Sequence, residues 1–246
     1  MNDLFDLTDR IIIVTGGSGF LGTQFRNSLE RAGAVAINFD IDTDVDTTNE
    51  SSVERAVALA VQKYGRIDGL ITSAAANPKA DETDNADGWL PYSEFPADLF
   101  RKEVDINITG SFIAAKTVSK HMVRGKRGSI VFISSHYGMV GPTNSLYKEG
   151  AYKSIAYGAS KAGVLGMMRF FAAYLGEYNV RANALVPGGM MRNHDAKFAS
   201  EYGKLTMLGR MADSGEYDGA VHFLLSDASS YMTGGALVVD GGITAR

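Results

Sequence analysis

The sequence predicts an α/β protein in which a doubly wound parallel sheet lies between two layers of helices. Three observations support this class: short apolar runs alternate with longer amphipathic stretches, a glycine-rich turn follows the first run, and no linker or composition shift divides the 246 residues. Strand–helix alternation of this kind produces right-handed βαβ units and a parallel sheet covered on both faces. We therefore expect one three-layer α/β/α domain over residues 1–246.

Six short segments are apolar or β-branched nearly throughout, which is typical of strands buried on both faces. They are Arg10–Thr15, Val35–Asp40, Gly69–Ser73, Ser129–Ser134, Arg181–Val186 and Ala236–Val239. The amphipathic stretches between them are predicted helices: Gly22–Ala32, Ser51–Tyr64, Pro96–Val123, Tyr157–Tyr178 and Ser214–Ser226.

Two stretches interrupt the alternation, the polar Asn77–Phe95 and the irregular, Met-rich Gly189–Met211. Each follows the carboxyl end of a predicted strand, which is where ligands bind in open α/β sheets. We expect the second stretch to cover the substrate. The alternative for both is a variable surface loop.

Composition excludes several functional classes. Hydrophobic residues make up 45% and charged residues 21% of the chain, as in ordinary globular proteins. A net charge of −4 without a Lys/Arg run argues against nucleic-acid binding, and the absence of cysteine excludes disulfides and thiolate chemistry. Four scattered histidines do not have zinc-ligand spacing, so we expect no metal. The first apolar run, Ile11–Val14, is too short for a membrane span or signal peptide, which makes a cytoplasmic location the default expectation.

The glycine-rich turn reads T-G-G-S-G-F-L-G from Thr15 to Gly22. Gly16 and Gly19 permit a tight turn and close approach of the backbone to a pyrophosphate, and the following helix N-terminus favours an anion. The second strand ends at Asp40, where a carboxylate accepts hydrogen bonds from ribose hydroxyls and repels a 2′-phosphate. These features predict a Rossmann-type sheet that binds NAD rather than NADP.

Tyr157 and Lys161 lie four residues apart in Y-G-A-S-K, so they project from one face of a predicted helix. An ammonium near a phenol favours the phenolate and lowers the phenol pKa from about 10 towards neutrality. Such a tyrosine can exchange a proton with an alcohol or carbonyl oxygen. Taken alone, the pair is equally consistent with a surface helix that carries a solvated lysine.

With several further motifs, these residues make essentially the whole chain resemble the short-chain dehydrogenase/reductase family. The further motifs stand in the family's order: V-D-T at 45–47, I-T-S-A-A at 71–75, D-I-N-I-T-G with Asn107, S-I-V-F-I-S-S with Ser135, V-R-A-N-A-L-V-P-G at 180–188 and T-G-G-A-L-V-V-D-G-G at 233–242. The resemblance implies that Tyr157 is the general acid/base and that Lys161 lowers its pKa and holds the nicotinamide ribose. Ser135 would donate a hydrogen bond to the substrate oxygen, and Asn107 would hold a water that continues the proton path.

The resemblance also implies the cofactor contacts and the assembly. The contacts would be Gly16, Ser18, Gly19, Phe20, Leu21, Asp40, Asp46, Ser73, Ala74, Tyr157, Lys161, Pro187 and Gly188. A homotetramer or homodimer is expected, with the helices Pro96–Val123 and Tyr157–Tyr178 at the dimer faces. Their apolar side chains are equally compatible with an ordinary core; they include Met167, Met168, Phe170, Phe171 and Tyr174.

The chain departs from the family pattern in four places. Its glycine spacing matches the longer branch of the family, whereas its length, Asn107 and D-G-G tail fit the short single-domain branch. Thr72, Ser73 and Ala75 replace amide and glycine positions beside the cofactor, and Arg192 stands where the family often has Thr. The interval between Ser135 and Tyr157 is also longer than usual. The extra segment brings Tyr147, Lys148, Tyr152 and Lys153 towards the site, which favours a polar, anionic substrate; the alternative is a solvated loop.

We predict an NAD-dependent oxidoreductase that interconverts a secondary alcohol and a ketone on a sugar, polyol or nucleotide-linked sugar. A lipid-like or acyl-carrier-linked ketone is an alternative substrate, because family members use both. The glycine spacing leaves open an epimerase or dehydratase of nucleotide-linked sugars with tightly held NAD. A cofactor-sensing protein without catalysis is a further alternative, although the complete tetrad argues against it.

Overall fold

The computed structural model describes residues 3–77 and 90–246. At its centre is a six-stranded parallel sheet in the order β2-β1-β3-β4-β5-β6, which confirms the predicted fold class. The strands are β1 (Ile11–Thr15), β2 (Val35–Phe39), β3 (Gly69–Thr72), β4 (Gly128–Ile133), β5 (Val180–Pro187) and β6 (Ala236–Val239). Each predicted strand is present, with ends shifted by at most one residue.

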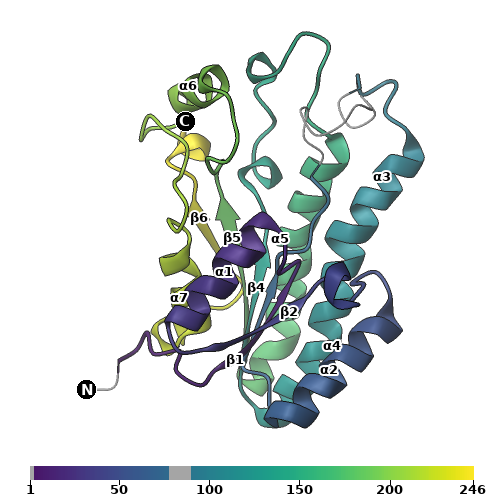
Figure 1. Ribbon diagram of the computed structural model, residues 1–246, viewed down its shortest axis with the longest axis vertical. Coiled ribbons are helices and arrows are strands. Elements are labelled where there is room, and N and C mark those ends of the chain that lie inside the picture. Colours follow the sequence, from purple (N-terminus) through teal and green to yellow (C-terminus); the bar gives the residue numbers. More distant parts are fainter. Residues whose placement is uncertain (1–2, 78–89) are drawn as a thin grey trace.

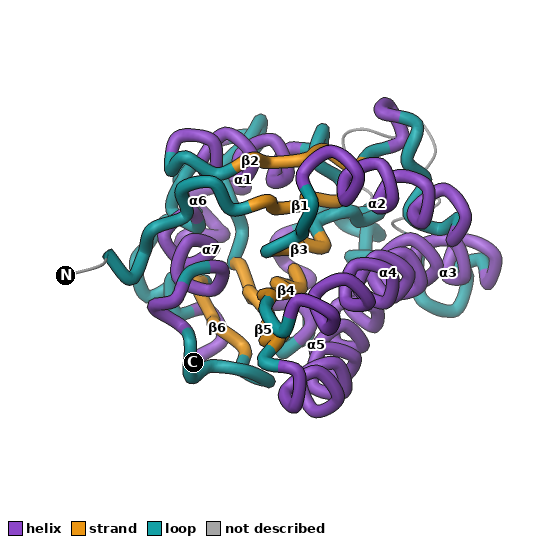
Figure 2. Tube along the Cα trace, turned by 90° about the horizontal axis from the view of Figure 1, so that it is seen from below, coloured by secondary structure: helices purple, strands orange, loops and turns teal. Residues whose placement is uncertain are grey.

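Helices cover both faces of the sheet, which runs through the middle of the molecule (Figure 1). They are α1 (Phe20–Arg31), α2 (Glu50–Tyr64), α3 (Ala97–Val104), α4 (Gly110–Gly125), α5 (Ile155–Leu175), α6 (Ala196–Leu205) and α7 (Asp218–Leu225). Figure 2 shows α2, α4 and α5 on one face and α1 and α7 on the other. In the described part of the chain, no helix is long and apolar enough to cross a bilayer.

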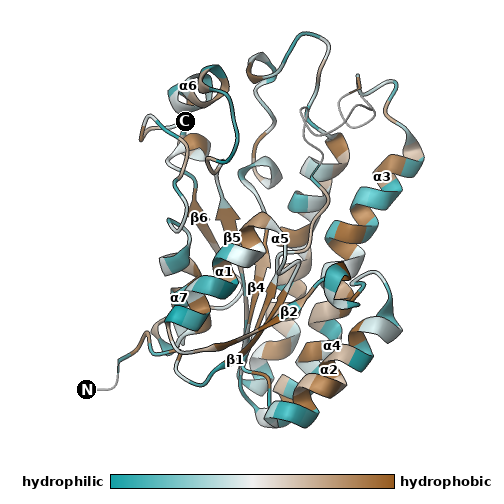
Figure 3. Cartoon of the chain, in the orientation of Figure 1, coloured by the Kyte–Doolittle hydropathy of each residue, from teal (hydrophilic) through white to brown (hydrophobic). Residues whose placement is uncertain are grey.

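Alternate residues of strands β1 to β5 pack into two separate cores, whereas Ala236 and Val238 of β6 are exposed. In β1, Ile13 packs in the core formed with α2, α4 and α5, whereas Ile12 and Val14 pack in the core formed with α1 and α7. In β3, Leu70 and Ile71 divide in the same way. The strands are accordingly hydrophobic along their length (Figure 3). Burial on both faces explains why the strand sequences are apolar throughout rather than alternating.

Two irregularities differ from the sequence prediction. The predicted helix Pro96–Val123 is divided into α3 and α4 by a π-helical segment, Asp105–Thr109. The stretch Gly189–Met211, predicted to be irregular, contains α6, and the side chain of Asp195 caps this helix by accepting a hydrogen bond from the Phe198 N–H (2.8 Å). Most of the other interrupting stretch, Asn77–Phe95, lies outside the described residues.

The direction of winding reverses at β1, because β2 lies on one side of it and β3 on the other. Ligands bind at the carboxyl ends of the strands beside such a switch point. The turn after β1 and the segment after β3 meet there, so closely that a methyl group on Gly16 would come within 2.5 Å of the Ala74 Cα. The topology therefore places the glycine-rich turn at the edge where a ligand is expected.

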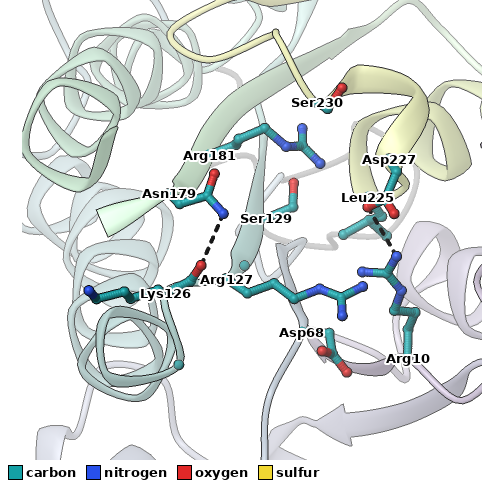
Figure 4. A pocket seen from close by; sticks show the side chains of 12 residues that line it. Arg10, Asp68, Lys126, Arg127, Ser129, Asn179, Arg181, Leu225, Asp227 and Ser230 are labelled. Atoms are coloured by element: carbon teal, nitrogen blue, oxygen red, sulfur yellow. Dashed lines mark hydrogen bonds and ion pairs between the residues drawn. The ribbon is translucent and has the colours of Figure 1, made fainter. Parts of the chain in front are cut away.

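The opposite edge, at the amino ends of the strands, holds a smaller hollow of about 430 Å³. Figure 4 shows the side chains of Arg10, Arg127 and Arg181, which lie at or just before the starts of three strands, reaching into it. Arg10 pairs with Asp227 (Nη2–Oδ1, 3.0 Å), and Arg181 donates to the Ser229 hydroxyl (2.7 Å) and the Ser226 carbonyl (3.0 Å). These bonds join the starts of β1 and β5 to the segment between α7 and β6.

Candidate active site

A cleft of about 1070 Å³ lies at the carboxyl ends of the strands. Its walls come from the turn after β1, the segments that follow β2, β3, β4 and β5, and α6. The predicted catalytic and cofactor-binding residues line this cleft, with the exceptions of Ser18 and Asn107. A volume of this size accommodates a cofactor together with a small substrate.

The turn after β1 presents backbone atoms to the cleft. Gly16 has a φ of +63°, a conformation that favours glycine, and its N–H donates to the Phe39 carbonyl (2.8 Å). A methyl group on Gly22 would lie 2.0 Å from the Gly16 carbonyl oxygen, so the helix could not pack so closely with a larger residue. The N-cap of α1 is Gly19, and no side chain caps the first N–H groups of the helix. This arrangement fits a pyrophosphate.

Asp40 follows β2, and its carboxylate is bonded to the glycine-rich turn. Oδ2 accepts from the Ser18 N–H (3.0 Å), and Oδ1 accepts from the Ile41 N–H (2.7 Å). The Ser18 hydroxyl in turn donates to Asp42 (2.7 Å). Ser18 therefore positions two carboxylates beside the turn without lining the cleft itself.

The remaining predicted cofactor contacts are held by local bonds. Asp46 accepts from both the N–H (2.8 Å) and the hydroxyl (2.7 Å) of Thr48. Beside Ser73, the Ala74 N–H donates to the Thr15 hydroxyl (3.3 Å). Each of these bonds fixes a segment that follows a strand, so the wall of the cleft is ordered before any ligand binds.

Beyond β5, the cleft wall continues through Pro187 and Gly188. The Pro187 carbonyl lies 3.4 Å from His136 Nδ1, and the Gly188 carbonyl accepts from the Tyr217 hydroxyl (3.0 Å). These contacts bond the end of β5 to the segment after β4 and to the start of α7.

β4 and α5 bring three of the four predicted catalytic residues together. Ser135 follows β4 and is buried, and its side chain contacts Tyr157 in the first turn of α5. The N–H of Tyr157 donates to the N-cap hydroxyl of Ser154 (3.2 Å). Lys161 lies one turn further along α5, with its Nζ 5.7 Å from the centre of the Tyr157 ring. The same Nζ donates to the Ile133 carbonyl (2.8 Å), which ties α5 to the end of β4.

Burial shifts the pKa values of Tyr157 and Lys161. It raises the pKa of Tyr157, and the hydrogen bond with the Ser135 side chain only opposes that effect. Burial also lowers the pKa of Lys161 to about 8. The sequence predicted a lowered pKa for Tyr157, whereas the pKa is raised in the protein alone, because removing the phenol from water disfavours its phenolate.

Asn107 lies on the π-helical segment and does not face the cleft. Its Oδ1 accepts from the Ala76 N–H (2.7 Å), and its Nδ2 donates to the Ala76 carbonyl (3.1 Å) and the Ser160 hydroxyl (2.8 Å). The side chain thereby joins the segment after β3 to α5. Its predicted role in holding a water stays a prediction.

Several aromatic residues form the substrate end of the cleft: Tyr147 comes from the extra segment that the sequence brought towards the site, whereas no motif indicated Tyr137 or Tyr202. The hydroxyls of Tyr137 and Tyr147 lie 2.7 Å apart, which bonds the long segment before α5 to the site. Tyr202 of α6 accepts a hydrogen bond from the Gly189 N–H (2.5 Å), and the His136 ring lies 3.9 Å from the Tyr137 ring. The position of His136 and Tyr137 directly after a strand was the available signal. Tyr202 gave none, because its helix was not predicted.

Positive charge predominates at this end. Arg192 lies with its guanidinium 5.0 Å from the centre of the Phe20 ring at the start of α1. Besides Lys161, the lining contains four cationic and two anionic side chains there: Lys148, Lys153, Arg192 and Lys197 against Asp195 and Glu201. Among the described residues, no three His, Cys, Asp or Glu side chains are grouped to hold a metal ion.

Comparisons with known proteins agree with this geometry. A family model described as enoyl-(acyl carrier protein) reductase matches residues 20–244. The chain is 32% identical to a 2,5-dichloro-2,5-cyclohexadiene-1,4-diol dehydrogenase of Sphingobium indicum, over 98% of this chain and 99% of that protein. It is also 32% identical to a trans-4-hydroxycyclohexanecarboxylate dehydrogenase of Sinomonas cyclohexanicum, over 92% of this chain and 76% of that protein.

The structure is similar to the crystal structure of a short-chain dehydrogenase from Leptospira borgpetersenii with bound NAD+, with a TM-score of 0.86 and 25% identity over 99% of this chain and 96% of that one. Fold, cleft, motif order and relatives therefore agree, and the chain belongs to the short-chain dehydrogenase/reductase family of oxidoreductases.

Proposed function

We propose that this protein is a single-domain, NAD-dependent oxidoreductase that interconverts a secondary alcohol and a ketone on a sugar or cyclic polyol. The observation that carries the reaction type is the convergence of Ser135, Tyr157 and Lys161 at one end of a cleft whose other end is the glycine-rich turn. A proton-transfer group at one end of the cleft and a binding site for a dinucleotide at the other suit an alcohol dehydrogenase.

The residues present fit a dinucleotide. Gly16 and Gly22 have no room for side chains, the backbone of this turn would hold the pyrophosphate, and Asp40 would bind the adenosine ribose. Bound nicotinamide supplies the hydride chemistry. The carboxylates of Asp40 and Asp42 place negative charge where a 2′-phosphate would lie, which supports NAD over NADP.

The protein's own residues handle the proton. In the oxidative direction the phenolate of Tyr157 accepts the proton of the substrate alcohol, and in the reductive direction the phenol returns it. The Ser135 hydroxyl donates a hydrogen bond to the same oxygen and stabilises the charge that develops on it. The ammonium of Lys161 favours the phenolate, and its bond to the Ile133 carbonyl fixes its position.

The walls of the cleft support the choice of substrate. Tyr137, Tyr147 and Tyr202 offer ring faces together with hydroxyl groups, which suits a hydroxylated carbon ring. Two relatives are named for alcohols on six-membered carbon rings, and another is an L-rhamnose 1-dehydrogenase of Azotobacter vinelandii.

The test is a panel of sugars, cyclic polyols, nucleotide-linked sugars and hydroxy acids, each incubated with the protein and NAD while reduced nicotinamide is followed by absorbance. We expect turnover of a ring alcohol by the wild type and none by Tyr157→Phe. A nucleotide-linked sugar that is converted without net reduction of NAD would replace this proposal with an epimerase. Binding of NADH without any conversion would replace it with a cofactor sensor.

We also propose a homodimer or homotetramer that uses the outer faces of α4 and α5. Phe170 is 82% and Tyr174 is 63% exposed there, whereas Met168 is fully buried in the core. An apolar surface of this kind is typical of an interface. Light scattering should report a multimer for the wild type and a smaller species for Phe170→Glu; a monomeric wild type would contradict the proposal.

A further inference from the structure

Tyr157 lies between two buried lysines rather than one. Lys161 is four residues after it, and Lys153 is four residues before it, next to the N-cap Ser154. Lys153 is only 7% exposed although it precedes the helix. Its Nζ lies 4.6 Å from the centre of the Tyr157 ring, closer than the 5.7 Å of Lys161.

We propose that Lys153 is a second cation for proton transfer, a positioning residue whose ammonium stabilises the phenolate of Tyr157. This inference rests on the proposed function, because it takes Tyr157 as the general acid/base. It assigns a catalytic contribution to the long segment before α5, whose role the sequence left open.

A buried carboxyl group supports the position of Lys153. Glu103 of α3 is 1% exposed, and its Oε2 accepts a hydrogen bond from the Ser154 hydroxyl (2.8 Å). Burial raises the pKa of Glu103, whereas Ser154 and the charge of Lys153 lower it. The lysine Nζ also donates to the Asn77 side chain. The ammonium is therefore placed by contacts on both sides of the cleft entrance.

Lys161 alone is poorly suited to ionise Tyr157. Burial lowers its own pKa to about 8, so its charge declines in the pH range where a phenol begins to ionise. The charge of a second lysine against the same ring compensates for that loss.

The other titratable groups around the phenol are neutral. Burial raises the pKa of Tyr137, Tyr147 and Tyr202 and lowers that of His136 to about 4. Among the described residues, the charged groups that contact the ring of Tyr157 are Lys153 and Lys161. Glu103 lies near Lys153, and further charges line the same cleft, from Lys148, Arg192, Lys197, Asp195 and Glu201.

The consequence is a shift in the ionisation of one tyrosine. An opposite charge within about 4–6 Å moves a pKa by one to three units. Lys153→Gln keeps a donor for Asn77 but removes the charge, so we expect the ionisation midpoint of Tyr157 to rise by about one unit or more. Lys153→Arg keeps the charge and should restore a midpoint close to that of the wild type.

The experiment is a pH titration of tyrosinate absorbance in the protein without substrate. The curve of each variant is compared with that of the same variant carrying Tyr157→Phe, so the difference isolates Tyr157 from the other tyrosines. Lys102→Met is the matched control, because it removes an exposed lysine from the same helix as Glu103 and should leave the midpoint unchanged.

Equal midpoints for the wild type and Lys153→Gln would overturn the proposal, and so would an equal rise in Lys153→Gln and Lys153→Arg. If Lys153→Gln does not fold, Glu103→Gln provides the test. Removing the carboxylate near Lys153 should lower the ionisation midpoint of Tyr157, and an unchanged midpoint would contradict the proposal. Because the titration needs no turnover, it stands apart from the substrate panel. A shifted midpoint with a silent panel would reject the proposed function and keep only the electrostatic effect of Lys153 on Tyr157.

Discussion

At the two ends of the same six strands, we compare polar side chains that have hydrogen-bond partners with polar side chains that have none. At the amino ends, Arg10 and Arg181 are bonded to partners from other elements. At the carboxyl ends, the Thr72 hydroxyl, His136 Nε2 and Glu103 Oε1 are buried and have no hydrogen-bond partner among the described residues. Satisfied polar groups stabilise a fold, whereas unsatisfied ones cost free energy. The amino edge therefore serves stability, and the carboxyl edge is prepared for a ligand.

The largest effect should follow from removing one oxygen at the carboxyl edge. Tyr157→Phe should reduce kcat/KM about a thousandfold, because general acid–base catalysis contributes about 10²–10⁴ in rate. Its free energy of unfolding in urea should stay within about 1 kcal/mol of the wild type, since the ring remains. If this variant lost stability as well as activity, the carboxyl edge would also contribute to stability, and the contrast between the two edges would fail.

The next effect is a pH dependence that arises at the carboxyl edge. Burial lowers the pKa of His136 to about 4, below its usual value, so the unfolded chain takes up the proton at higher pH than the folded protein. The contribution of neutral His136 is therefore present above pH 6.5 and lost as pH falls towards 4, on the order of 3 kcal/mol in all. Urea unfolding of the wild type and His136→Gln across this range should show a smaller slope in the variant. If the free energies of unfolding of the two proteins changed in parallel with pH, His136 would not be the cause of the pH dependence.

At the amino edge, Arg181→Met should lower stability and leave the chemistry intact. It removes two hydrogen bonds and leaves the Ser226 carbonyl without that donor, which costs about 1–3 kcal/mol. Arg127→Met is the control: this side chain lines the same hollow but is exposed, so its removal should cost less than about 0.5 kcal/mol. NADH affinity, measured by fluorescence, should be unchanged in both. Weaker NADH binding in Arg181→Met would mean that the two edges are coupled.

The smallest effect concerns the choice of cofactor. Asp40→Asn keeps one of the two side-chain acceptors for the Ser18 and Ile41 N–H groups and removes the charge, so it should reduce the preference for NADH over NADPH by about tenfold, or 1.4 kcal/mol. The ratio of the two dissociation constants is the measurement. A wild type that binds both cofactors equally would show that Asp40 does not select between them.

Local patterns were sufficient for much of this protein. Strands β1 to β5 pack on both faces and are continuous apolar runs, and β6 is an apolar run as well although Ala236 and Val238 are exposed. The glycine-rich turn needs only its own backbone. The six strands and the position of Gly16 therefore followed from short windows of sequence. The division of α3 from α4 did not, because the π-helical segment keeps a helical spacing of apolar residues. Helix α6 was missed since its stretch is rich in Met and Gly.

Long-range contacts account for the rest of the site. Lys153 and Glu103 are far apart in the sequence, and the residues around them do not indicate that either is buried. Their burial follows from the packing of α3 beside the N-cap of α5. The direction of the Tyr157 pKa has the same origin, because it depends on how much water the surrounding segments exclude. A motif identifies which side chain reacts, whereas its electrostatics depend on the packed neighbours.

The π-helical segment Asp105–Thr109 has a consequence for changes in chain length. Successive residues of an α-helix are rotated by about 100° around its axis. A π-helical turn contains one residue more than an α-helical turn. Loss of one codon within this segment would therefore let it close into regular α-helix, with α3 and α4 keeping their mutual orientation. A one-residue deletion inside α3 or α4 would instead turn the residues beyond it by about 100°. The gene should therefore accept a one-residue deletion within Asp105–Thr109 that spares Asn107 more readily than one in the flanking helices.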